Sequence, residues 1–282
     1  MAEPLLAAGV VVASPFALFV VVLTGGAYAF GRDRWHRCAR RQIVGVKTVA
    51  LFYAGLLTVA VALASPLDAG AESSLPEHMI QHVLLLSVAG PLLAFGMPLP
   101  TLLWALPAQL RRRSVSVVRR LQRGHDRRGA IWLTSALVAE AAVMWGWHVP
   151  SLYEAAIRNS VVHAAEHASF LLVSTAAWWS VATMRRSLRG AAAVAALLGS
   201  VPGMALGVAM VLAPRPWYPI YSTGRVVDAL ANQQLAGVIM WAFGGMAAVI
   251  AGAALFASWL AGDAPEPVAR MTVAAARPGA AR

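Results

Sequence analysis

Residues 191–213 read AAAVAALLGSVPGMALGVAMVLA, an uncharged run bounded by Arg189 and Arg215. A helix needs about 20 consecutive, largely apolar residues to cross the hydrocarbon core of a membrane. Similar runs recur along the whole chain. The seven predicted spans are Val10–Phe30, Ile43–Ala64, Glu77–Gly96, Ala130–His148, Val161–Met184, Ala191–Ala213 and Gln233–Leu260. The sequence therefore predicts an all-α integral membrane protein with seven transmembrane helices.

The composition agrees with a membrane protein and argues against a soluble one. Hydrophobic residues make up 59% of the chain and charged residues 12%, whereas soluble domains carry roughly 25% charged residues. The net charge of +11 would suit a nucleic-acid-binding protein. The basic residues lie between apolar runs, however, so they do not form one basic face and no nucleic acid is expected. The single cysteine, Cys38, excludes a disulfide framework and a cysteine-based metal site.

The basic residues are concentrated in alternate loops. Six follow the first span, eight follow the third, three follow the fifth and three lie in the tail, which accounts for 20 of the 23. Because Lys and Arg accumulate in cytoplasmic loops, this pattern predicts seven spans with the N-terminus outside and the C-terminus in the cytoplasm. Glu3 precedes the first apolar run and Arg32 follows it, which is the reverse of a cleaved signal peptide. The first span is therefore expected to be retained.

Two segments outside the spans are also informative. In 108–123, Leu110, Val117 and Leu121 follow helical spacing opposite a group of arginines. This segment is either an amphipathic helix lying on anionic membrane lipid or a solvated linker whose charges only fix the topology. Residues 263–282 are rich in Ala and Pro and are expected to be a disordered cytoplasmic tail, which leaves residues 1–262 as a single transmembrane domain.

Five of the seven histidines fall at the predicted outer ends of spans. These are His78, His82, His148, His163 and His167. Histidine is costly within a membrane span and usually marks a functional site there. The other two, His36 and His125, lie among arginines in the predicted cytoplasmic loops, and we interpret them as surface residues.

The spacing of these histidines brings pairs of them onto one helix face. His78 and His82 are four residues apart in the third span, and His163 and His167 repeat this spacing in the fifth. The sequence Ser74-Leu75-Pro76-Glu77 predicts a capping box before the first pair, and Asn159 or Ser160 is expected to cap the helix that carries the second. In the fourth span, Met144 and His148 share a face. Three helices thus deliver imidazoles to the same depth.

This constellation favours a metal site. The partial positive charge of a helix N-terminus disfavours imidazolium, so these histidines should be neutral, which is the form that binds metal. Glu166 is expected to orient an imidazole from behind the ligands. Imidazole suits copper, zinc and iron, whereas the thioethers of Met79 and Met144 would select Cu(I). The alternative is that the histidines only form hydrogen bonds between helices.

Two other functions fit parts of the pattern. His163-Ala164-Ala165-Glu166-His167 matches the H-x-x-E-H motif of zinc metallopeptidases, in which the glutamate is the general base. That motif is short, and it leaves His78, His82 and His148 without a role. A haem-binding membrane protein would use one histidine from the third span and one from the fifth as axial ligands.

Several blocks of sequence, in the same order along the chain, resemble the multi-span bacterial cytochrome c oxidase assembly factor CtaG family, which differs from the single-span copper chaperone that shares its name. The blocks are Pro66-Leu67-Asp68, His78-Met79-Ile80-Gln81-His82 running to Gly96-Met97-Pro98, Trp147-His148-Val149-Pro150-Ser151-Leu152-Tyr153, Val162-His163-Ala164-Ala165-Glu166-His167, Trp178-Trp179, Tyr218-Pro219-Ile220-Tyr221 and Gln233-Gln234-Leu235 running to Met240-Trp241. The resemblance implies a chaperone in the bacterial plasma (inner) membrane that assists a haem-copper oxidase subunit by delivering copper. It implies no enzymatic reaction.

Overall fold

The computed structural model describes residues 14–38, 44–96, 98–184, 186–221 and 226–260. Every regular element within these ranges is helical. The predicted tail, residues 263–282, and the beginning of the first predicted span lie outside the described residues. The all-α prediction is therefore confirmed for the part of the chain that the structure describes.

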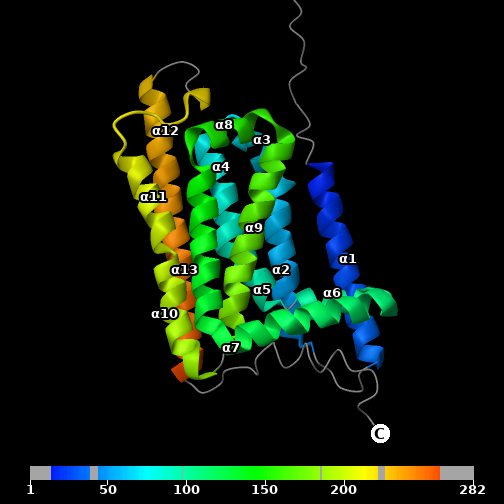
Figure 1. Cartoon of the computed structure of the whole chain (residues 1–282). Coiled ribbons are helices and arrows are strands. Elements are labelled where there is room, and N and C mark those ends of the chain that lie inside the picture. The colour runs from blue at the N-terminus through cyan, green and yellow to red at the C-terminus, as the bar shows by residue number, and fades with distance from the viewer. Residues whose placement is uncertain (1–13, 39–43, 97, 185, 222–225, 261–282) are drawn as a thin grey trace, which may run out of the picture.

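The helices form one bundle with shorter elements at both ends (Figure 1). In chain order they are α1 Pro15–Cys38, α2 Val46–Leu63, α3 Pro66–Ala71, α4 Leu75–Val83, η1 Leu84–Ala89, α5 Gly90–Phe95, α6 Pro98–Ala105, α7 Ala108–Trp147, α8 Pro150–Arg158, α9 Ser160–Ala182, η2 Arg186–Leu188, α10 Arg189–Gly199, α11 Val201–Leu212, η3 Pro219–Tyr221, α12 Val226–Ile239, η4 Met240–Gly244 and α13 Gly245–Leu260. The segments η1 and η4 are π-helical turns that connect α4 to α5 and α12 to α13. The short helices α3 and α8 lie together at one end of the bundle, and α6 lies at the other.

Six helical segments in the described residues are long and apolar enough to cross a membrane. They are Pro15–Cys38, Val46–Leu63, Leu75–Phe95, Arg128–Trp147, Arg189–Leu212 and Asp228–Ala257. The helix α9, which corresponds to the fifth predicted span, has 23 residues but is not among the six. It is long enough, but His163, Glu166 and His167 make it more polar than the others. It packs inside the bundle against α5 and α7.

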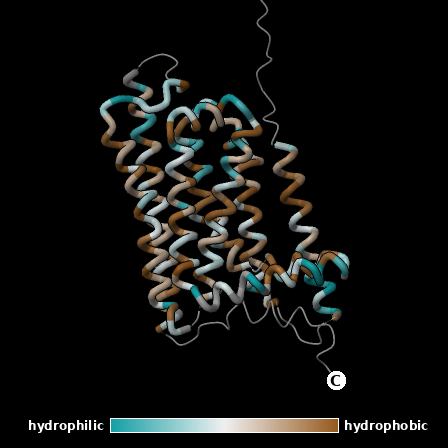
Figure 2. Tube along the Cα trace, viewed as in Figure 1, coloured by the Kyte–Doolittle hydropathy of each residue, from teal (hydrophilic) through white to brown (hydrophobic). Residues whose placement is uncertain are grey.

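The surface of the bundle is suited to lipid. Hydrophobic residues predominate along the lengths of the helices, and hydrophilic residues gather at the ends and along the first part of α7 (Figure 2). Large apolar side chains such as Phe19, Leu172 and Leu212 are exposed. A soluble monomer rarely exposes so much contiguous apolar surface. The structure therefore supports a membrane protein.

Two segments between the predicted spans are helical. The helix α1 continues to Cys38, so the first arginines of the predicted loop lie on it, and Trp35 is buried there against Trp104 with 6.4 Å between ring centroids. The basic segment after α6 forms the first part of α7, which lies across the end of the bundle and bends at Arg128, where φ is −133° and ψ is 38°. The guanidinium of Arg111 lies 4.2 Å from the Trp104 ring centroid. The helical alternative for this segment is confirmed, and its contact with anionic lipid stays a prediction.

The two predicted helix caps have different outcomes. The Asn159 side chain caps α9, because its Oδ1 accepts hydrogen bonds from the backbone N–H groups of Val161 and Val162 at 2.9 and 3.2 Å. Ser74 is the residue that precedes α4, but its side chain makes no capping hydrogen bond. The predicted capping box is therefore wrong, since the Glu77 carboxylate lies instead beside Gly70, where it fills the space that a Cβ would need.

The helices α11 and α12 approach each other closely at two glycines. A Cβ added to Gly207 would lie 2.6 Å from the Gly237 carbonyl oxygen, and one added to Gly237 would lie 2.5 Å from the Gly207 carbonyl oxygen. Small residues let transmembrane helices pack at this distance. We expect Gly207→Ala to destabilise the protein by about 1–3 kcal/mol, as overpacking usually does. Thermal unfolding in mild detergent would measure this.

The matched control is Gly26→Ala on α1, because a Cβ there meets nothing within 4 Å. Both changes add the same methyl group to a helix, so they share the same gain in helix propensity. Equal melting temperatures for the two variants would contradict the close packing of α11 on α12.

Candidate metal centre

Two helices face each other through their histidines. The buried residues of α9 include Glu166, His167, Phe170 and Ser174, whose spacing defines the inward face of that helix. On α4, His78 and His82 lie one turn apart and are fully buried. The ring centroid of His78 lies 5.0 Å from that of His163 and 5.6 Å from that of His167. The helical spacing in the sequence thus brings the two pairs together in space, as predicted.

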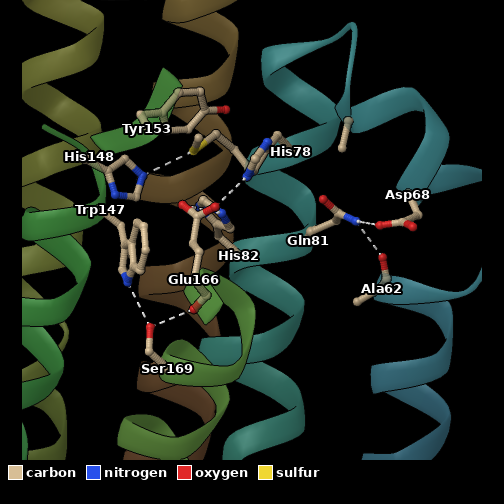
Figure 3. Close-up of polar contacts among 12 residues, drawn as sticks. Ala62, Asp68, His78, Gln81, His82, Trp147, His148, Tyr153, Glu166 and Ser169 are labelled. Carbon is tan, nitrogen blue, oxygen red and sulfur yellow. Dashed lines mark hydrogen bonds and ion pairs between the residues drawn. The ribbon is translucent and has the colours of Figure 1, made fainter. Parts of the chain in front are cut away.

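Glu166 lies between the two histidines of α4 (Figure 3). Its Oε2 is 3.5 Å from Nε2 of His78, and its Oε1 is 3.5 Å from Nε2 of His82. The backbone of this residue is tied into a short chain of hydrogen bonds, in which Trp147 Nε1 donates to Ser169 Oγ at 2.8 Å and Ser169 Oγ donates to the Glu166 carbonyl at 2.7 Å. The predicted role of Glu166, to orient an imidazole, fits these distances, and its carboxylate is also one of the candidate donor atoms. We refer to His78, His82, His163, Glu166 and His167 as the His/Glu cluster.

The donor atoms of the cluster are close enough to share one ion. One ligand atom from each of His78, His163, Glu166 and His167 lies within 4.8 Å of the other three. The fifth member, His82, contacts the Glu166 carboxylate at Oε1, whereas His78 contacts Oε2. Three imidazoles and a carboxylate form a donor set that copper, zinc and iron all accept.

Most of the same atoms have no hydrogen-bond partner among the described residues. This holds for both ring nitrogens of His82, for Nε2 of His163 and His167, and for both carboxylate oxygens of Glu166, whereas His78 has the Ala71 backbone as a neighbour. Buried polar groups in folded proteins are nearly always paired, because an unpaired one costs free energy. A cation among these atoms would pair with several of them at once. The arrangement therefore fits a metal ion.

His148 lies beside the cluster and has different contacts. Its Nδ1 is 2.7 Å from the Met144 carbonyl oxygen, and its Nε2 is 3.4 Å from the Met79 sulfur. When Nδ1 donates to the carbonyl, Nε2 is left free to accept a hydrogen bond or bind a metal. The His148 ring is next to His82, at 5.3 Å between centroids, but it is outside the four mutually close ligands. The Met144 sulfur faces Gly203 on α11.

Three tyrosines cover the cluster at the α3 and α8 end. The Tyr153 ring lies over His78 at 4.9 Å between centroids, and its hydroxyl is 3.1 Å from that of Tyr221. The Tyr218 hydroxyl donates to the His148 carbonyl at 2.9 Å. Burial raises the pKa of Tyr153 and of Tyr218, so both stay protonated. No local spacing marks these residues, and in the sequence they stand out only in the blocks that carry the family resemblance.

The most accessible member of the cluster is His163, which is half-buried. Its electrostatic neighbours are the carboxylates of Asp68 and Glu72. Asp68 Oδ1 accepts a hydrogen bond from Gln81 Nε2 at 2.9 Å, and the same amide donates to the Ala62 carbonyl at 2.7 Å (Figure 3). Burial raises the pKa of Asp68, and the hydrogen bond from Gln81 opposes this. Negative charge beside the accessible ligand would attract a cation to this side of the cluster.

The two remaining histidines are separate from the cluster. His36 lies in the last turn of α1. That end of α1 is at the α6 end of the bundle, whereas α3 and α8 lie at the other end (Figure 1). The side chain of His125 is outside the part of α7 for which side chains are described. Neither is part of the group of four close ligands found in the described residues.

A comparison with protein families identifies one that covers most of the chain. The family model described as cytochrome c oxidase caa3 assembly factor (Caa3_CtaG) matches residues 26–262. No curated protein and no solved structure shows a significant match to this chain. The matched region contains every residue of the His/Glu cluster, together with His148 and the three tyrosines.

Proposed function

The chain belongs to the cytochrome c oxidase caa3 assembly factor family, and we propose that it holds copper in the His/Glu cluster and delivers it to a haem-copper oxidase subunit. The observation that carries this proposal is the group of buried imidazole and carboxylate atoms that lack a hydrogen-bond partner. The oxidase as the partner is inferred from family membership. Metal binding is inferred from the His/Glu cluster.

The charge of the cluster favours Cu(I) over a divalent ion. Glu166 carries the one carboxylate of the cluster, and neutral imidazoles supply the other donors. One monovalent cation and one carboxylate leave no net charge in this buried site. A divalent ion would leave an excess positive charge in a medium of low dielectric constant, which is costly. The Met79 thioether beside His148 adds a soft donor that also suits Cu(I).

Delivery would use ligand exchange at the accessible side of the cluster. His163 is the half-buried ligand, and acidic side chains lie next to it. A donor group on the partner would replace His163 first and the buried ligands afterwards. Such a transfer makes and breaks only metal–ligand bonds, so we propose a metallochaperone and not an enzyme.

The geometry gives less support to the two other functions. The imidazole rings of α4 pack against those of α9 at centroid distances of 5.0–5.6 Å, so a porphyrin could enter only if these helices separated. In the metallopeptidase mechanism the glutamate must act on a water beside the metal. Glu166 instead lies between His78 and His82, within reach of both.

We further propose that α9 crosses the bacterial plasma membrane, which makes seven spans and places the His/Glu cluster on the outer side. A reporter fused after Arg158 should be outside the cell, and one fused after Arg189 should be in the cytoplasm. The reason is that 20 of the 23 basic residues then lie in cytoplasmic segments. A fusion after Arg123 is the control for the preceding span and should report cytoplasm. The same compartment at Arg158 and Arg189 would show that α9 does not cross.

The direct test of the proposed function is the metal content of the purified protein. Protein extracted in mild detergent from copper-supplied cells should contain copper and lack a haem absorption band. Zinc in place of copper, or no metal after Cu(I) addition, would contradict the proposal.

A further inference from the structure

Two adjoining cavities lie inward of the His/Glu cluster, between α7, η1, η4 and the junction of α10 with α11. Each has a volume of about 70 Å³, and they share Ser87, Glu140 and Ser200 in their walls. The first is also lined by His82 of the cluster, and the second extends along α9 to Trp178. One water needs roughly 10–15 Å³. The space, which we call the Glu140 cavity, therefore has room for a small ion and its ligands.

Glu140 is a carboxylic acid within the apolar part of α7. It lies seven residues before Trp147, which is about 10 Å along the helix from the outer end of that segment. Its hydrogen-bond partner is Ser174 of α9, and none of the ion pairs among the described residues includes Glu140. An ionisable residue at this depth is costly and marks an ion site or pathway by default.

The helices around Glu140 are interrupted at its level. Both π-helical segments, η1 and η4, line the cavity, and they meet where Ser87 Oγ lies 3.7 Å from the position of a Cβ on Gly244. The α10–α11 junction at Ser200 forms part of the same wall. Ser174 Oγ donates to the Leu86 carbonyl of η1 at 2.5 Å. Irregular backbone within a membrane is tolerated where it lines a cavity, and π-helical turns occur frequently at functional sites.

Three thioethers, from Met144, Met204 and Met240, line the cavity that His82 also lines. The Met144 sulfur lies 3.3 Å from the position of a Cβ on Gly203, which is also in the wall. The Met204 sulfur lies 3.9 Å from Ser200 Oγ. A methionine is usually apolar filler. These three share a cavity with the Glu140 carboxylate, which is in none of the ion pairs of the described residues, and that combination suits a soft monovalent cation.

We propose that the Glu140 cavity is a second Cu(I) site, separate from the His/Glu cluster and adjoining it at His82. The thioethers of Met144, Met204 and Met240 are the soft ligands, and the Glu140 carboxylate balances the charge. The choice of ion rests on the proposed function, whereas the existence of the site rests on the cavity. A divalent ion is disfavoured here because it would leave net positive charge within the membrane.

The test is the number of Cu(I) ions that the detergent-purified protein holds against a competing chromophoric Cu(I) chelator. Wild type should hold two ions per chain, and the double variant Met144→Leu, Met204→Leu should hold one. Leucine conserves the volume of methionine, so these changes should leave the packing nearly intact. X-ray absorption should show sulfur ligands in wild type and none from these residues in the variant. Met210→Leu is the matched control, since Met210 is buried on α11 outside the cavity.

The variants of the two sites separate the two proposals. His78→Ala with His163→Ala should lose the nitrogen-bound ion and keep the sulfur-bound one. Retention of two ions by the double methionine variant, or one ion in wild type without sulfur ligands, would overturn the second site and leave the His/Glu cluster unaffected. Wild type could instead hold a single ion with sulfur ligands, and the histidine double variant could keep that ion. This result would overturn copper binding by the His/Glu cluster and uphold the cavity site.

Discussion

The substitutions His78→Ala and His167→Ala, made separately, are expected to weaken Cu(I) binding at the His/Glu cluster by more than about 100-fold each. Both side chains are buried and both belong to the four candidate ligands whose donor atoms lie close together. Loss of a group that only supports a ligand typically costs 10–100-fold in metal affinity, so loss of a ligand should cost more. Titration against a chromophoric Cu(I) chelator would measure the change. The half-exposed His163 should give a smaller effect, because water can take its place.

His36→Ala is the control for this experiment, since His36 lies on α1 away from the cluster. It should bind Cu(I) as wild type does. Wild-type affinity in both His78→Ala and His167→Ala would mean that the clustered histidines only hold α4 and α9 together. Copper binding by the His/Glu cluster would then be contradicted.

The second large effect is expected in the cell. Deleting the gene for this protein should lower haem-copper oxidase activity and leave a copper-independent quinol oxidase unchanged. The double variant His78→Ala, His163→Ala should fail to restore that activity at limiting copper, because it lacks two of the four close ligands. Added copper should restore part of the activity, since mass action can replace a carrier. Oxygen consumption with each electron donor would measure both oxidases.

The matched control strain carries His36→Ala and should behave as wild type. The double variant must be present in the membrane at the wild-type level, which immunoblotting would establish. Full oxidase activity in that strain at limiting copper would exclude copper handling as the role of the cluster. A deletion that no amount of copper rescues would point to a scaffold for folding the oxidase subunit.

The sequence predicted those parts of the site that depend on local periodicity. The four-residue spacing of His78 with His82, and of His163 with His167, places each pair on one face whatever the rest of the fold does. The position of Glu166 was predicted less well. Whether its carboxylate lies among the ligands or behind them depends on how α9 is rotated against α4, and that rotation is set by packing across the bundle.

The sequence also predicted some of the helix boundaries and not others. The apolar runs predicted where the long helices lie, but for the basic segment 108–123 the sequence left a helix and a linker as alternatives, because arginines interrupt the apolar pattern. In the structure this segment continues as helix up to the bend at Arg128. The same reasoning explains why α9 is not among the six apolar helices of the described residues: His163, Glu166 and His167, the candidate ligands that it carries, also make it polar.

Metal binding by the unpartnered donor atoms of the His/Glu cluster would also link the metal supply to the lifetime of the protein. Without a cation, buried polar atoms of α4 and α9 remain unsatisfied, which costs folding free energy. A cation that binds only the folded chain stabilises it, by about 2.7 kcal/mol at 100 times its dissociation constant. Empty copies would thus unfold locally more often than loaded ones and meet membrane proteases sooner. The abundance of the protein would then follow the copper supply without any transcriptional regulator.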